Sequence, residues 1–216
     1  MWSFSTAWVR YFVYDNSRSH SVAEGVLGKD LQGVLVSDFY WAYSYSLGLH
    51  PRCWVPLLGD VHKLRLQYPT QGVLEWAGKL RELYDGAKAF SSECPKARRQ
   101  ARLAFQSELV EWALPYTKTG LPQSVLASRL VQLEAELFTF AEHPFVPSEN
   151  NAAERAVGPR GIARKIRGGT RSAQGSKTMA VLSSLFETWR LRGEDCLQAC
   201  RKMLNASQRP EPAPDT

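Results

Sequence analysis

The stretch GVLVSDFY, residues Gly33–Tyr40, is a compact apolar run that ends abruptly on the carboxylate of Asp38. A short run of this kind, rich in valine and leucine, is typical of a buried β-strand. Proteins with α/β folds often present functional groups at the carboxyl ends of such strands. The stretch therefore predicts a mixed α/β fold and makes Asp38 a candidate metal ligand. The alternative is that Asp38 caps the segment that follows it, and the residues alone leave both open.

The sequence on either side of this stretch predicts strands first and helices afterwards. Residues 1–15 are dense in aromatic and β-branched side chains and predict two short strands, whereas Ser19 to Leu27 predict a short helix closed by Gly28. Residues 72–143 repeat apolar side chains at helical spacing, and further helices are expected at 178–192 and 194–205. This order is typical of an α/β core interrupted by an all-helical insertion.

We expect four regions along the chain. They are a first part of the core at residues 1–71, a helical insertion at 72–143, a second part of the core at 144–205 and a disordered, proline-rich tail at 206–216. A chain of 216 residues with 44% hydrophobic residues is large enough to bury a substantial core. The four cysteines follow no zinc-binding spacing, which favours free thiols in a reducing cytoplasm.

The stretch NNAAERAVGPRGIARKIRGGTRSAQGSKT, Asn150 to Thr178, is basic but contains one carboxylate, Glu154. Its cationic residues are Arg155, Arg160, Arg164, Lys165, Arg167, Arg171 and Lys177. Small residues between them expose backbone N–H groups, which suit phosphate oxygens together with arginine. We therefore expect phosphate contact, although a solvated basic face is the alternative. Glu154 is either a metal ligand or the partner of a nearby arginine in a surface ion pair.

Five segments, taken in order, carry a resemblance to a known family. They are GVLVSDFYWAY, RCWVPLLGDVHKL, HPFVPSENNAAERAVGP, ARKIRGGTRSAQGS and SLFETWRLRG. Together they resemble the catalytic portion of the insertion-sequence-66 family of bacterial transposases. The resemblance runs from about Trp2 to Leu204, and its most distinctive part is the Asn-Asn-Ala-Ala-Glu-Arg block.

The resemblance implies a ribonuclease-H-like core with a helical insertion, and a DD-E recombinase that nicks DNA and joins transposon 3′ ends to a target. Position by position, Asp38 matches the second aspartate of the catalytic triad and Glu154 matches its glutamate. Both would then hold Mg²⁺ or Mn²⁺, in a two-metal site if a further acid completes it. The cationic residues from Arg155 to Lys177 would hold DNA.

The chain departs from the family pattern in two ways. The family's first aspartate lies on a strand upstream of the WSFST segment, whereas this sequence begins at Met1, so we expect a truncated and catalytically impaired copy. The residues themselves suggest Asp15, at the end of YFVYD, as the third acid, but the resemblance places that position on a neighbouring strand and argues against it. Pro56 and Gly59 stand where relatives often have histidine and arginine, which removes a plausible DNA or structural contact.

The expected partner is DNA, as transposon ends and as target, with further copies of the chain, a separate upstream half or accessory transposition proteins as additional candidates. The expected location is the bacterial cytoplasm, at the nucleoid, and no apolar run approaches membrane-spanning length. Two other functions remain open. A non-catalytic DNA-binding or regulatory protein would bind DNA without magnesium, and a related metal-dependent nuclease would nick DNA without joining it.

Overall fold

The computed structural model describes residues 1–40, 43, 48–150 and 169–207. The chain divides into two compact units, one made of residues 19–150 and the other of residues 1–18 together with 151–216. Among the described residues the fold is mixed but mostly helical, with a two-stranded sheet in the second unit. None of the described helices is long and apolar enough to cross a membrane.

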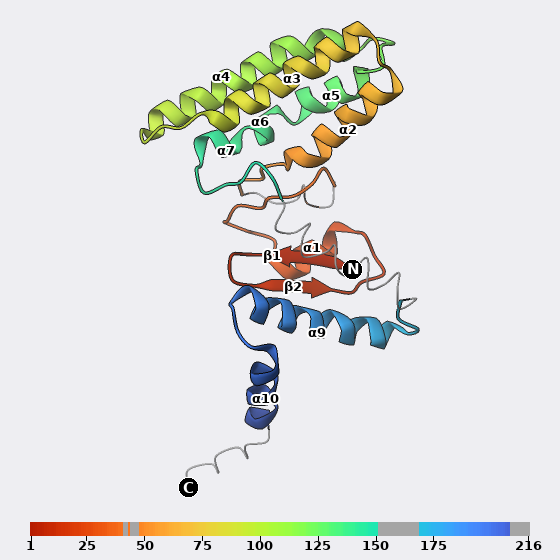
Figure 1. The fold of residues 1–216 in the computed structure, drawn as a ribbon, viewed down its shortest axis with the longest axis vertical. Coiled ribbons are helices and arrows are strands. Elements are labelled where there is room, and N and C mark those ends of the chain that lie inside the picture. Colours follow the sequence, from red (N-terminus) through yellow and green to blue (C-terminus); the bar gives the residue numbers. More distant parts are fainter. Residues whose placement is uncertain (41–42, 44–47, 151–168, 208–216) are drawn as a thin grey trace. The chain divides into compact units, whose positions relative to one another are not determined.

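The unit formed by residues 19–150, the helical unit, is shown in Figure 1. Its helices are α1 (His20–Leu27), α2 (Trp54–Gln67), α3 (Gln71–Ala89), α4 (Pro95–Ala113), α5 (Ser124–Gln132), α6 (Glu134–Leu137) and α7 (Thr139–Glu142), with the 3₁₀ turn η2 at Leu114–Tyr116. The expected helix at the start of this unit is confirmed, and Ser19 caps it by accepting a hydrogen bond from the backbone of Ser21.

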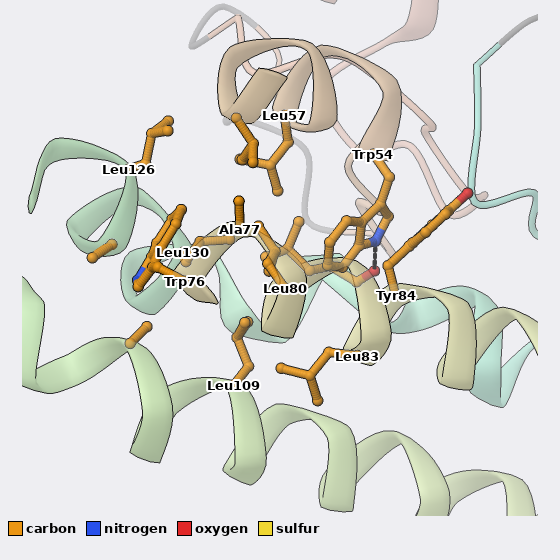
Figure 2. Close-up of a cluster of buried hydrophobic side chains, with 14 of the residues drawn as sticks. Trp54, Leu57, Trp76, Ala77, Leu80, Leu83, Tyr84, Leu109, Leu126 and Leu130 are labelled. Atoms are coloured by element: carbon orange, nitrogen blue, oxygen red, sulfur yellow. Dashed lines mark hydrogen bonds between the residues drawn. The ribbon is translucent and has the colours of Figure 1, made fainter. Parts of the chain in front are cut away.

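The core of the helical unit lies between α2, α3, α4 and α5 (Figure 2). α3 contributes buried residues at helical spacing, from Val73 and Trp76 through Leu80 to Tyr84. Trp54, at the start of α2, is fully buried, and its ring lies 4.9 Å from that of Tyr84. Its indole N–H donates to the backbone carbonyl of Leu137 over 2.6 Å. The first residue of α2 is therefore anchored to the far end of the helical block.

Local sequence explains where the longer helices begin. Thr70 accepts a hydrogen bond from the backbone N–H of Val73 and so caps α3, while Pro95 opens α4 at a position where its missing N–H costs nothing. Pro56 stands in the first turn of α2, where no intrahelical donor is required. The departure from the family pattern at Pro56 is thus compatible with an uninterrupted helix.

The described part of the second unit contains a hairpin and two helices. Strand β1 (Trp2–Ser5) pairs antiparallel with β2 (Arg10–Val13), and α9 (Ala173–Leu191) runs along β2 (Figure 1). Thr188 accepts a hydrogen bond from the backbone N–H of Arg10 and donates one to its carbonyl, both over 3.0 Å. Ser184, one turn earlier, accepts from the N–H of Phe12. Hydroxyl groups of α9 therefore satisfy the strand edge that β1 leaves open. The last helix is α10 (Cys196–Ser207).

The structure differs from the sequence-based expectation at two places in the helical unit. The end of the region of helical spacing, residues 124–143, forms three short helices, α5, α6 and α7, instead of one continuous helix. The expected strand at Gly33–Tyr40 appears as two isolated parallel bridges, Val34 with Leu49 and Ser37 with Arg52. The ribonuclease-H-like core and the expected domain boundaries stay predictions, and the expected tail at 208–216 lies outside the described residues.

Proline chemistry explains why the pairing is interrupted. The N–H of Leu35 donates to Leu49, that of Ser37 donates to Pro51, and that of Cys53 donates back to Ser37. In a continuous parallel ladder the residue at position 51 would donate to the carbonyl of Leu35. Pro51 has no N–H, so this rung is missing and two bridges remain on either side of it.

Candidate functional site

Asp38 follows the last bridge of this parallel pair and is exposed. Its carboxylate oxygen Oδ1 accepts a hydrogen bond from the backbone N–H of Tyr40 over 3.0 Å. This local contact to the backbone two residues on occupies one lone pair of one oxygen. A carboxylate with such a local hydrogen bond still offers hard oxygen ligands to a divalent cation.

Four segments meet beside Asp38, and we call their meeting point the Asp38 junction. They are residues 34–38, 49–54, 136–137 and 148–150. Ser37 and Arg52, at its centre, are only 3% and 4% exposed. The Arg52 guanidinium donates through Nε to the carboxylate of Glu136 and through Nη1 to the carbonyl of Asp38, the latter over 2.8 Å. A buried charge next to the candidate ligand is thus paired and hydrogen-bonded.

The hydrogen bonds around Ser37 define its proton positions. Its hydroxyl donates to the carbonyl of Asp38 over 2.8 Å, so the other contacts of Oγ must come from donors. Arg52 Nη1 is one donor, over 3.3 Å, and Nε2–H of His50 is the other, over 2.7 Å. Burial, followed by the charge of Arg52, lowers the pKa of His50 to about 4. His50 is therefore a neutral imidazole near pH 7, which is consistent with a single proton on Nε2.

The chain that leads to the Asn150 block is anchored at the same junction. The backbone N–H of Asn150 donates to the sulfur of Cys53 over 3.0 Å, and the N–H of Trp54 donates to Ser148 over 3.0 Å. Glu149 accepts from the hydroxyl of Tyr84 over 3.0 Å and pairs with Lys88 over 2.7 Å. These contacts join residues 148–150 to α2 and α3. Cys53, which accepts from Asn150, itself donates to the carbonyl of Ser37.

Most of the other predicted site residues lie outside the described residues. These are Glu154, Arg155, Arg160, Arg164, Lys165 and Arg167. Arg171 and Lys177 are described, and both are exposed. Arg171 precedes the capping residue of α9, Ser172, and Lys177 lies in the second turn of that helix. A helix N-terminus with exposed cations is a favourable surface for phosphate.

Among the described residues there is no cluster of three or more histidine, cysteine, aspartate or glutamate side chains. The carboxylate of Asp38 nevertheless suits magnesium, which commonly binds one or two carboxylates together with waters and substrate phosphates.

Asp15, which the residues alone suggested as a third acid, accepts a hydrogen bond from the backbone N–H of Ser17 in a local turn.

Sequence reasoning missed the role of Arg52. It belongs to the segment RCWVPLLGDVHKL, which was noted as a motif, yet no function was assigned to the arginine. A charged residue inside a short apolar segment that is expected to be buried is the available signal, because such a charge needs a partner. That partner, Glu136, lies 84 residues further along the chain, so the spacing of residues in the sequence could not identify it.

Comparison with known proteins supports the class of protein that these features suggest. The model of the Transposase IS66 family matches residues 1–178, which is most of the chain. The chain therefore belongs to the IS66 family of transposases, and this membership associates it with DNA transposition and with DNA as a partner. No curated protein and no solved structure matches the chain.

Proposed function

We propose that the chain acts on DNA ends in transposition, with Asp38 and Glu154 as ligands of Mg²⁺ or Mn²⁺ in strand cleavage and 3′-end joining. Family membership supports the class of reaction. The observation that carries the assignment of the site is the anchoring of Asn150 to Cys53, whose own N–H donates to Ser37, the neighbour of Asp38. Asn150 precedes Glu154 by four positions in the sequence.

In this proposal the side chains of the protein hold the metal ion and bind the DNA phosphates. Asp38 would supply hard oxygen ligands from a backbone fixed by buried groups, and Glu154 would supply a second carboxylate. Arg171 and Lys177, with the cations between Arg155 and Arg167, would bind DNA phosphates. A bound divalent cation would stabilise negative charge on the reacting phosphate.

DNA binding is tested by the salt dependence of affinity for a transposon-end duplex. Each phosphate contact removed lowers the magnitude of the slope of log K against log salt by about 0.9. Arg171→Ala and Lys177→Ala should each lower it by about this amount, whereas Lys118→Ala, an exposed lysine of the helical unit, should leave it unchanged. Equal slopes for the wild type and the three variants would contradict phosphate contacts from the start of α9.

Catalysis is tested by incubating the full chain with labelled transposon-end DNA, a target plasmid and Mg²⁺ or Mn²⁺. We expect metal-dependent cleavage and joining that Asp38→Asn and Glu154→Gln both abolish without reducing DNA affinity. Cleavage without joined products would support a nuclease. Binding that is indifferent to metal and to both substitutions, with no cleavage, would support a non-catalytic DNA-binding protein and overturn the proposal.

A further inference from the structure

Arg52 connects the candidate metal ligand to the helical core. Arg52 is buried, with only 4% of the residue exposed. One end pairs with Glu136, whose own backbone carbonyl also accepts the N–H of Arg52 over 3.2 Å. The other end donates to the carbonyl of Asp38 over 2.8 Å and to the hydroxyl of Ser37 over 3.3 Å.

The carbonyl of Asp38 is held from two sides. It accepts from Nη1 of Arg52 and from the hydroxyl of Ser37, both over 2.8 Å, and a carbonyl oxygen has two lone pairs. Ser37 is itself held by His50 and Arg52, so the two donors to Asp38 belong to one hydrogen-bonded cluster. The backbone of Asp38 is thereby fixed, while its carboxylate is left exposed on the surface.

Stability alone does not account for a charged residue at this place. Replacing a buried ion pair with apolar side chains of similar volume is often neutral or stabilising, because desolvation offsets much of the attraction between the charges. An apolar side chain at position 52, however, could not donate to the carbonyl of Asp38. Ligands of metal ions are commonly oriented by hydrogen bonds from neighbouring groups, and loss of such a group costs 10- to 100-fold in affinity or activity.

We propose that Arg52 is a positioning residue, which fixes the backbone of Asp38 so that its carboxylate is preorganised to bind a divalent cation. This inference rests on the proposed function of Asp38 as a metal ligand. Arg52 acts through Asp38 and not by contact with DNA or metal. Its planar, forked guanidinium is suited to the task because it pairs with Glu136 and reaches the Asp38 carbonyl at the same time.

The test measures binding of Mn²⁺ to the full chain, by electron paramagnetic resonance of the free ion, in the absence of DNA. Arg52→Lys keeps the charge and can still pair with Glu136, but it loses the fork. Arg102→Lys is the matched control, because Arg102 also pairs with a glutamate, Glu142, and donates to a backbone carbonyl, that of Ala135. Asp38→Asn reports on the ligand itself, and Ser37→Ala removes the second donor to the Asp38 carbonyl.

We expect Arg52→Lys to weaken Mn²⁺ binding by about 10-fold or more. Arg102→Lys should bind as the wild type does, and Asp38→Asn should remove the site. Hydrogen exchange of the Tyr40 amide, which donates to the Asp38 carboxylate, should become faster in Arg52→Lys and stay unchanged in Arg102→Lys. If Arg52→Lys does not fold, Ser37→Ala takes its place, with weaker Mn²⁺ binding and faster Tyr40 exchange expected again.

The outcomes separate this inference from the proposed function. Loss of Mn²⁺ binding in Asp38→Asn, with wild-type binding and exchange in Arg52→Lys and in Ser37→Ala, would overturn the role of Arg52 and leave the metal site standing. Mn²⁺ binding that is absent in the wild type, or unaffected by Asp38→Asn, would overturn the metal site and the role of Arg52 with it. An equal loss in Arg102→Lys would mean that the effect is one of general stability, and would also refute the positioning role.

Discussion

The backbone N–H of Asn150 donates a hydrogen bond to the sulfur of Cys53 over 3.0 Å and so joins residues that lie 97 positions apart. Cys53 is fully buried, and its own N–H donates to the carbonyl of Ser37 over 2.8 Å. One residue, Cys53, therefore connects Asn150 with the segment that ends at Asp38, through its sulfur on one side and its backbone N–H on the other. The length of the helical block between Cys53 and Asn150 does not separate these two segments in space.

Cys53→Ala should destabilise the helical unit by about 1–3 kcal/mol, because it leaves the partly buried N–H of Asn150 without its acceptor and opens a small cavity at a fully buried residue. Urea denaturation followed by tryptophan fluorescence measures this change. Cys94→Ala, at an exposed cysteine, should change the free energy of unfolding by less than about 0.5 kcal/mol. Equal effects of the two substitutions would show that the sulfur contact contributes nothing.

The neutral imidazole of His50 predicts a pH-dependent stability. Burial lowers its pKa in the folded protein to about 4, below the usual 6.5, so the unfolded chain binds the proton more tightly between these values. The stabilising contribution is fully present above pH 6.5 and is lost as the pH falls from 6.5 towards 4. The urea midpoint of the wild type should therefore be lower at pH 5 than at pH 7.5.

His50→Gln isolates this contribution, because glutamine does not titrate and can still donate to Ser37. The difference between the two urea midpoints should shrink in His50→Gln and keep its wild-type size in His62→Gln, which changes an exposed histidine of α2. A wild-type difference that persists in His50→Gln would assign the pH effect to carboxylates instead.

The sequence could predict the elements of the helical unit better than the way in which they connect. Apolar spacing located α3, and the serine before His20 located the cap of α1, because both signals are local. The apolar composition of residues 33–40 predicted a continuous strand, whereas the structure has two isolated bridges there. The pairing is interrupted because of Pro51, which belongs to the partner segment, residues 49–52. The interruption could therefore be explained only once the pairing of residues 34–37 with 49–52 was known.

In the candidate site, too, local patterns could be predicted from the sequence and contacts between distant segments could not. Asp38 was accessible to sequence reasoning because an apolar run ending on a carboxylate is a local pattern. The groups that hold its backbone come from Arg52 and Ser37, and the charge that balances Arg52 comes from Glu136. These contacts depend on which distant segments meet, and no periodicity in the sequence encodes that choice.

Cys94 should be the fastest-reacting thiol among the described cysteines. It is exposed at the start of α4, where the backbone N–H groups of Ala97 and Lys96 and the charge of Arg98 lower the pKa of its thiol. The thiolate is the reactive form, so iodoacetamide at pH 7 should modify Cys94 first and leave the buried Cys53 unmodified until the protein is unfolded. Peptide mass spectrometry over time measures both. Rapid modification of Cys53 in the native protein would contradict its burial.

The contact between α9 and β2 makes a prediction for the second unit. Thr188→Val keeps the shape of the side chain but removes the hydroxyl that serves both the N–H and the carbonyl of Arg10. Two partly buried backbone groups lose their partner, so we expect a loss of about 1–3 kcal/mol in the stability of this unit. The measurement is hydrogen exchange at the amide of Arg10, which should become faster.

Thr188→Ser is the matched control, because it keeps the hydroxyl and removes only a methyl group. The amide of Arg10 should exchange at nearly the wild-type rate in this variant. The amide of Phe12 bonds to Ser184 and not to Thr188, so it should be less affected in Thr188→Val than that of Arg10. Uniform acceleration at both amides in both variants would indicate that packing of α9, and not its hydroxyl groups, protects the edge of β2.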